Sequence, residues 1–336
     1  MNRRHAIAVS LAALFLAFLV PGQDSLAVDS AVRLSAVLVT APSGVNSLEF
    51  SPDGKLLASA DGNGTIRLWD SATSRPVGPP LQTGIGSQGS VTAVAFSPGG
   101  TLLAAAYADG AVRIWDPGTS QLHSPVLRSA GSQASANAVA FGPDGKLLAT
   151  AYGNGTVRLW DLATSQPEGS PLHTGPGSVN ALAFSPDGKL LAAAYGNGTV
   201  RLWDLAAGQP RGPALGTGSQ ASANAVAFGP DGKLLATAYG NGTVRLWDLA
   251  TSRPEGSPLR TGPGSVNALA FSPDGKLLGT AYGDAIRIWV RAAGQPGGPD
   301  NISWLAILAF AIAIAVSALA VIATVLGIRR LKKAYQ

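Results

Sequence analysis

The feature that constrains this chain most is a tryptophan, usually followed by aspartate, that returns at nearly constant spacing. It stands at Trp69, Trp115, Trp160, Trp203, Trp247 and Trp289. The steps between these tryptophans are 46, 45, 43, 44 and 42 residues, and only Trp289 is followed by Val instead of Asp. A period of about 40–45 residues with several short strands per unit is typical of an array of propeller blades. Such units bury their faces only by stacking on one another.

One unit illustrates the pattern of strands and turns. Strands are expected at residues 138–141, 146–152, 156–160 and 167–174. Pro143-Asp144-Gly145 supplies the first turn, because Pro presets φ and Gly accepts positive φ. Gly153-Asn154-Gly155 is expected to form a two-residue hairpin turn, for which Asn-Gly is the favoured pair. Four strands in one sheet leave both faces apolar, so neighbouring sheets are expected to cover each other.

The six in-phase copies resemble WD40 repeats over residues 33–291. The resemblance implies an all-β, six-bladed propeller that binds protein partners and is not an enzyme. Family units often carry a buried network of His, Ser/Thr, Trp and Asp. Here the Gly-His pair is missing, and the second-turn Asp is replaced by Asn in four repeats, at Asn63, Asn154, Asn197 and Asn241. We therefore expect the blades to depend on Phe and Trp packing more than on that network.

A strand without a repeat of its own precedes the first blade, at residues 34–39. Leu38 precedes Val45 by seven residues, as Leu172 precedes Val179 in a complete unit. The sixth unit stops after its third strand, so we expect residues 34–39 to supply its outer strand and to pair with residues 286–288. This closure would remove open strand edges, which otherwise template aggregation. Family members more often have seven blades, and no sequence remains for a seventh.

The two ends of the chain carry membrane-directed patterns. Residues 1–27 combine Arg3-Arg4, an apolar run and a small-residue site, which predicts a signal peptide, with an uncleaved signal anchor as the alternative. Residues 292–301 form a Gly/Pro-rich linker, residues 302–328 a transmembrane helix, and residues 329–336 a basic cytoplasmic tail. We therefore expect a single-pass protein of the cell membrane with its propeller outside. The Ala- and Gly-rich composition suggests a high-GC bacterium.

Charge and composition exclude several classes of function. The net charge of +5 arises at the termini, because residues 28–300 contain 18 Lys+Arg and 18 Asp+Glu. A nucleic-acid-binding domain needs clustered basic charge, so no nucleic-acid partner is expected. Cysteine is absent, which removes disulfides and thiolate metal sites.

No catalytic or metal-binding constellation is evident. His123 and His173 lack accompanying ligands at metal-binding spacing, and the aspartates recur at equivalent turn and Trp-Asp positions, which indicates a structural role. No cofactor or metal is expected. Two other classes remain open: a carbohydrate or cell-wall ligand-binding propeller that uses its tyrosines, and a propeller enzyme.

The candidate partner face combines repeated tyrosines with variable connections between blades. The tyrosines precede the second hairpin turn: Tyr107, Tyr152, Tyr195, Tyr239 and Tyr282. The connections that vary in length contribute Gln88, Gln133 and Gln220. Tyr offers a large amphipathic contact area, and binding often concentrates on loops. The alternative is that the rings wedge between blades and never meet a partner. The sequence leaves the oligomeric state open.

Overall fold

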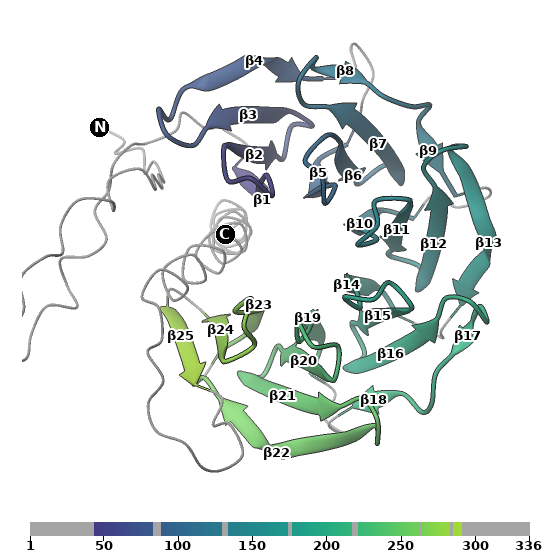
Figure 1. Ribbon diagram of the computed structural model, residues 1–336, viewed down its shortest axis with the longest axis vertical. Coiled ribbons are helices and arrows are strands. Elements are labelled where there is room, and N and C mark those ends of the chain that lie inside the picture. Colours follow the sequence, from purple (N-terminus) through teal and green to yellow (C-terminus); the bar gives the residue numbers. More distant parts are fainter. Residues whose placement is uncertain are drawn as a thin grey trace, which may run out of the picture.

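The computed structural model describes residues 44–82, 89–129, 134–173, 177–216, 221–262, 264–282 and 285–290. Within these ranges the chain forms six antiparallel sheets arranged around one axis, and Figure 1 shows each sheet running from the axis to the outer rim. The expected all-β architecture of six blades is confirmed. The expected signal peptide, residues 34–39, the linker, the transmembrane helix and the tail lie outside the described residues.

Each blade begins with a strand next to the axis and continues outward. The innermost strands are β1 (Val45–Phe50), β5 (Val91–Phe96), β10 (Ala136–Phe141), β14 (Val179–Phe184), β19 (Ala223–Phe228) and β23 (Val266–Phe271). The second strands are β2 (Leu56–Asp61), β6 (Leu103–Tyr107), β11 (Leu147–Tyr152), β15 (Leu190–Tyr195), β20 (Leu234–Tyr239) and β24 (Leu277–Tyr282).

The remaining strands complete the blades toward the rim. The third strands are β3 (Ile66–Asp70), β7 (Ala111–Asp116), β12 (Thr156–Asp161), β16 (Thr199–Asp204), β21 (Thr243–Asp248) and β25 (Ala285–Val290). The outer strands are β4 (Pro76–Leu81), β8 (Gln121–Leu122) with β9 (Leu127–Arg128), β13 (Gln166–His173), β17 (Gln209–Pro210) with β18 (Leu215–Gly216), and β22 (Arg253–Arg260). Blades 1 to 6 therefore comprise β1–β4, β5–β9, β10–β13, β14–β18, β19–β22 and β23–β25.

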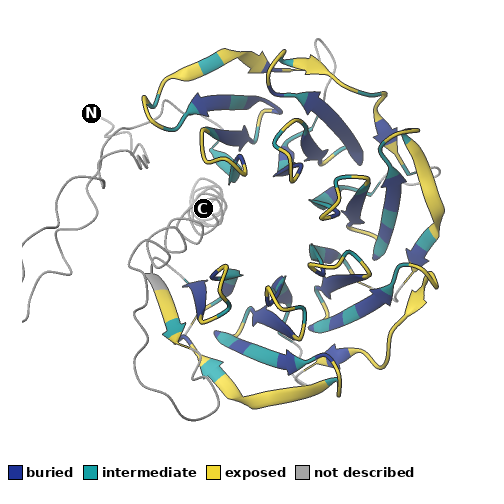
Figure 2. Cartoon of the chain, in the orientation of Figure 1, coloured by how far each residue is buried: buried dark blue, intermediate teal, exposed yellow. Residues whose placement is uncertain are grey.

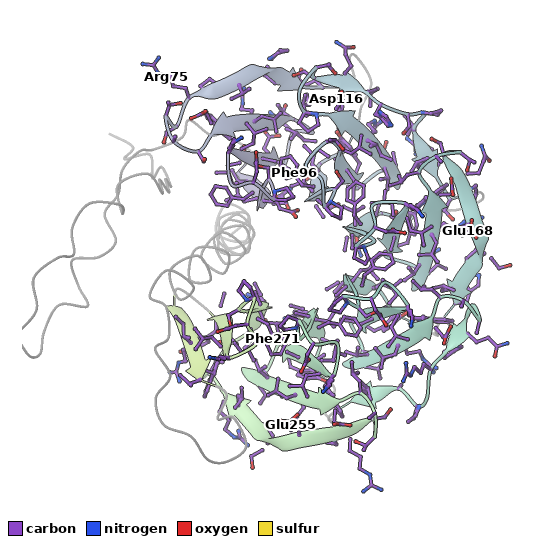
Figure 3. The ribbon with its side chains drawn as sticks, viewed as in Figure 1. Arg75, Phe96, Asp116, Glu168, Glu255 and Phe271 are labelled. Carbon is purple, nitrogen blue, oxygen red and sulfur yellow. The ribbon has the colours of Figure 1, made fainter. Side chains whose placement is uncertain are left out.

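The core lies in the seams between neighbouring blades. In the seam between blades 1 and 2, Ile66 and Leu68 of one sheet pack with Val91, Phe96 and Tyr107 of the next (Phe96 is labelled in Figure 3). Equivalent clusters fill the next four seams. Figure 2 shows the result: the second strands are almost entirely buried, the innermost strands are mostly intermediate in exposure, and the rim is exposed. Stacking thus covers the faces that a single blade cannot cover alone.

The seam between blades 6 and 1 differs from the other five. The inner strands β1, β5, β10, β14, β19 and β23 contact their neighbours in that order, but the described parts of β23 and β1 make no comparable contact. Figure 1 shows a correspondingly wider interval between these two strands. Blade 6 has three strands in the described residues, and Ile288 and Val290 on its last strand are 42% and 70% exposed.

The expectation of a two-residue hairpin turn at residues 153–155 is wrong. In blade 3 the last pair of opposed residues is Ala151 and Val157, and Gly155 N–H donates to Tyr152 O across a wider turn. Gly155 has φ of 86°, so Gly, and not Asn154, takes the positive φ. The Asn154 side chain instead accepts hydrogen bonds from the backbone and hydroxyl of Thr156 at 3.2 and 2.7 Å. Asn therefore suits this turn through its side-chain oxygen.

Candidate partner-binding face

Two sets of turns define opposite faces of the ring. In blades 1 to 5 the second hairpin turn bonds to the residue just before the innermost strand, as Gly153 N–H does to Ser135 O at 2.9 Å. We call the face with these turns and the described ends of the connections between blades the loop face. The first hairpin turn bonds to the turn that follows Trp-Asp, as Leu162 N–H does to Lys146 O at 2.9 Å. We call that face the turn face.

On the turn face, repeated polar side chains stabilise the first hairpin turns. Ser51 donates its hydroxyl proton to Asp53 at 2.6 Å, and Asp53 also accepts from Lys55 N–H at 3.1 Å. These hydrogen bonds, that of Ser51 foremost, lower the pKa of Asp53. The turns of adjacent blades also lie close together: a Cβ on Gly188 would stand 3.2 Å from Pro143 of the preceding blade. These aspartates are therefore occupied by local structure, as the sequence predicted.

The aspartate of Trp-Asp has an equally local role. Asp161 accepts from both the backbone N–H and the hydroxyl of Thr164, at 2.7 and 2.9 Å. This pair of bonds lowers the pKa of Asp161 and fixes the turn into the outer strand. Ser165, the next residue, holds φ of 56°, and Gly208 takes the same position in blade 4. The repeated carboxylates thus shape turns and do not converge on a site.

The tyrosines proposed for the partner face lie in the seams. Four of them, Tyr107, Tyr152, Tyr195 and Tyr239, are at most 2% exposed, and Tyr282 is partly buried. Burial raises the pKa values of Tyr107 and Tyr152 to about 12. This placement favours packing between blades over contact with a partner. The carbohydrate-binding alternative loses the exposed set of tyrosines on which it was based. The other predicted contacts, Gln88, Gln133 and Gln220, lie outside the described residues.

Part of the polar network remains in four blades, at the positions where the sequence retains Ser or Thr. The indole N–H of Trp160 donates to Thr150 Oγ1 at 3.1 Å, and that of Trp69 donates to Ser59 Oγ at 2.8 Å. Equivalent bonds join Trp247 to Thr237 and Trp289 to Thr280. A buried indole N–H needs an acceptor, and the second strand supplies it independently of the lost His and Asp.

Two blades lack this hydrogen bond. Ala105 and Ala193 stand where other blades have Ser or Thr, and the buried indole nitrogens of Trp115 and Trp203 have no hydrogen-bond partner in the described part of the chain. The sequence alone showed the alanines but not the tryptophan as the group left unpaired.

A set of amide hydrogen bonds between blades was missed by the sequence analysis. Asn180 Nδ2 on β14 donates to Ser222 Oγ and Ala223 O on the next blade, at 3.0 and 3.1 Å. Asn46, Asn137 and Asn224 make the same pair of bonds across their own seams. Blade 2 uses Thr92, whose hydroxyl donates to Ala136 O at 2.5 Å. The repeated Asn was the available signal, but its partner lies more than 40 residues away.

Groups that could hold a metal ion are not found in the residues that the structure describes. His123 and His173 are exposed on outer strands or beside them, as expected from their positions. No helix within the described ranges is long and apolar enough to cross a membrane.

The fold and its repeated turns define a propeller assembled from Trp-Asp units. The family profile "WD domain, G-beta repeat" matches residues 34–70, 78–116, 124–161, 169–204, 213–248 and 256–289. The chain belongs to this WD40 family, whose members generally mediate protein–protein interactions and are generally not catalytic. A comparison with curated proteins found no match.

Proposed function

We propose that this protein is a non-catalytic platform for protein partners, held at the cell membrane with its propeller outside the cytoplasm. The observation that supports the platform is the use of the repeated polar groups. The carboxylates of Asp53 and Asp161 cap turns, and the hydroxyl of Thr150 binds an indole. Enzymes need an asymmetric set of reactive groups, whereas a rigid ring with exposed turns suits binding.

Membrane attachment rests on the sequence of the two ends. The apolar run of residues 302–328 is long enough to span a bilayer and is followed at once by Arg329 and Arg330. Basic flanks favour the cytoplasmic side, which places the basic tail inside and the propeller outside. Protease added to intact protoplasts should digest the propeller and leave a small protected tail fragment. A propeller that survives conditions under which known surface proteins are shaved would contradict this topology.

The platform is tested by photo-crosslinking from each face in living cells. A photo-reactive residue replaces exposed Asn63 or Asn241 on the loop face, and exposed Lys146 or Lys233 on the turn face serves as the matched position. We expect one protein to crosslink from the loop face only, and to bind the purified full chain directly. Equal labelling from both faces, or turnover of a substrate without any bound protein, would contradict the proposal.

A further inference from the structure

The ring is neutral in total, yet its charges are divided between the two faces. On the turn face, blades 3 to 5 carry the exposed Asp–Lys pairs of the first hairpin turns together with the Trp-Asp carboxylates. On the loop face, the second turns and the described parts of the connections in the same blades, residues 134–136, 152–156, 177–179, 195–199, 221–223 and 239–243, contain no Asp or Glu. The count of charges along the sequence conceals this division.

Arginines from the third strands supply positive charge in the seams near the loop face. Arg158 on β12 lies opposite Thr150, on the same side of the sheet as Tyr152, and its charge acts on that tyrosine. Arg245 has the same relation to Tyr239. In blade 2 the geometry is explicit, with the Arg113 guanidinium 4.2 Å from the centre of the Tyr107 ring.

Arg113, the arginine of blade 2, lies near a carboxylate that has no counterpart in the second turns of the next three blades. Asp109 lies 3.9 Å from Arg113 and 2.8 Å from Arg128. The corresponding turn residue is neutral Asn154, Asn197 or Asn241 in blades 3 to 5.

Arg158, Arg201 and Arg245 consequently take part in no salt bridge within the described ranges, and each remains partly open to solvent. The Nε atoms of Arg158 and Arg245 are buried without a partner there, as are those of Arg67 and Arg113 in blades 1 and 2. A partly buried guanidinium without a counter-charge is costly, and its planar fork matches a carboxylate.

We propose that the loop face over blades 3 to 5 binds an acidic segment of a protein partner, with carboxylates seated on Arg158, Arg201 and Arg245. This proposal rests on the platform function and names the chemistry of the partner. A protein segment fits better than a nucleic acid, because the three arginines stand on separate blades and no Lys lies in the loop-face segments of these blades. Nucleic acids need a dense basic footprint.

The test uses the purified full chain and a fluorescein-labelled peptide of alternating Glu and Gly, with a Gln–Gly peptide as the uncharged comparison. The Glu peptide should bind and the Gln peptide should not. A triple change of Arg158, Arg201 and Arg245 to Gln should weaken binding by about tenfold or more, since charge-assisted bonds are lost. The matched triple change of Lys146, Lys189 and Lys233 to Gln removes equal charge from the turn face and should leave binding unchanged.

A second variant keeps the test decisive even if the triple change of the arginines to Gln unfolds the protein. Changing Asn154, Asn197 and Asn241 to Asp recreates beside each arginine the arrangement of Asp109, so the ring should stay folded while peptide binding falls similarly. Equal effects of the Arg and Lys triples, full binding by the Asp variant, or arginine-dependent binding of oligothymidine in place of the peptide would overturn the proposal. A partner crosslinked in cells but insensitive to the Asp variant would reject acidic recognition and leave the platform standing.

Discussion

The five seams between successive blades and the sixth seam, from blade 6 back to blade 1, are built differently. At the five seams a tyrosine from the later blade packs into the core. An Asn side-chain amide, or the Thr92 hydroxyl in blade 2, donates a hydrogen bond across the seam. At the sixth, Asp61 stands where the others have Tyr, and Gly44 where the others have Ser. The first blade therefore lacks the Tyr and Ser with which each of the other blades packs against the blade before it. The comparison teaches that this seam cannot close by copying the other five.

The largest effect is expected from removing residues 28–40. If residues 34–39 complete blade 6, their loss leaves β25 as an unpaired apolar edge, because Ile288 and Val290 are already exposed. We expect aggregation and a lower melting temperature, measured by light scattering and calorimetry. A chain starting at Ala41 that stays monomeric with an unchanged melting temperature would contradict this closure.

The register of the closure can be tested separately with cysteines, since the chain has none. In complete blades the outer-strand Leu faces the second residue of the third strand, as Leu172 faces Val157. The equivalent pair is Leu38 and Ile286. A Leu38→Cys, Ile286→Cys variant should form a disulfide on oxidation. The one-residue shift to Val37→Cys with Ile286→Cys is the matched control and should not.

Changing a seam tyrosine is expected to have the next largest effect. Tyr239 is fully buried, so Tyr239→Ser should lower the free energy of unfolding by about 3 kcal/mol through lost burial and an unfilled cavity. The matched change at the sixth seam, Asp61→Ser, removes turn hydrogen bonds and the attraction to Arg67 but also relieves a partly desolvated carboxylate, so it should cost about 1 kcal/mol. Chemical denaturation compares the two. Similar losses at both positions would erase the distinction between the seams.

Blade 1 also differs at Glu49, where every other blade has Ala. Burial raises its pKa to about 8 from 4.5, against the opposing effect of a hydrogen bond from Phe96 N–H. Because the folded chain then holds a proton that the unfolded chain releases, stability should fall as pH rises from about 4.5 to 8. Glu49→Ala should flatten this dependence and stabilise the chain at pH 8 by about 2 kcal/mol. Melting curves across pH test this, and identical slopes for both chains would refute it.

The smallest effect is expected from completing the polar network of blade 4. Ala193→Thr places a hydroxyl beside the unpaired indole of Trp203, as Thr150 does for Trp160 in blade 3. The gain should be about 1 kcal/mol in the free energy of unfolding. Ala193→Val has the same shape without the hydroxyl and is the control. If both variants gain or lose equally, the hydrogen bond contributes nothing.

The sequence predicted the blades well because each strand and turn is encoded locally. Strand ends at Tyr152 and Trp160 were placed to within a residue, and Gly145 was identified as a turn glycine. What it could not predict depends on residues brought together from different blades. The hydrogen bond from the Asn180 side-chain amide to Ser222 joins residues 42 positions apart. The tyrosines look the same in sequence whether they face a partner or a seam. The division of charge between the two faces also becomes visible only when the arrangement of the blades in the ring is known.

The outer strands show how the ring manages its edges. Each outer strand, or the interruption within it, carries proline: Pro76, Pro79 and Pro80 in blade 1, Pro125 in blade 2, Pro167 and Pro171 in blade 3, Pro210 and Pro213 in blade 4, and Pro254 and Pro258 in blade 5. Proline cannot donate to a ladder, so a foreign strand cannot add to these edges in full register.

The strand β25 contains no proline. It is therefore the one rim position of the described blades at which an unblocked strand edge remains, and a terminal strand from another copy would fit there as well as the chain's own. Such an exchange is heterologous, joining the end of one molecule to the beginning of the next, and it propagates into a filament or a larger ring. Concentrated, partly unfolded protein should then assemble head to tail through blade 6, while the other five rims stay inert.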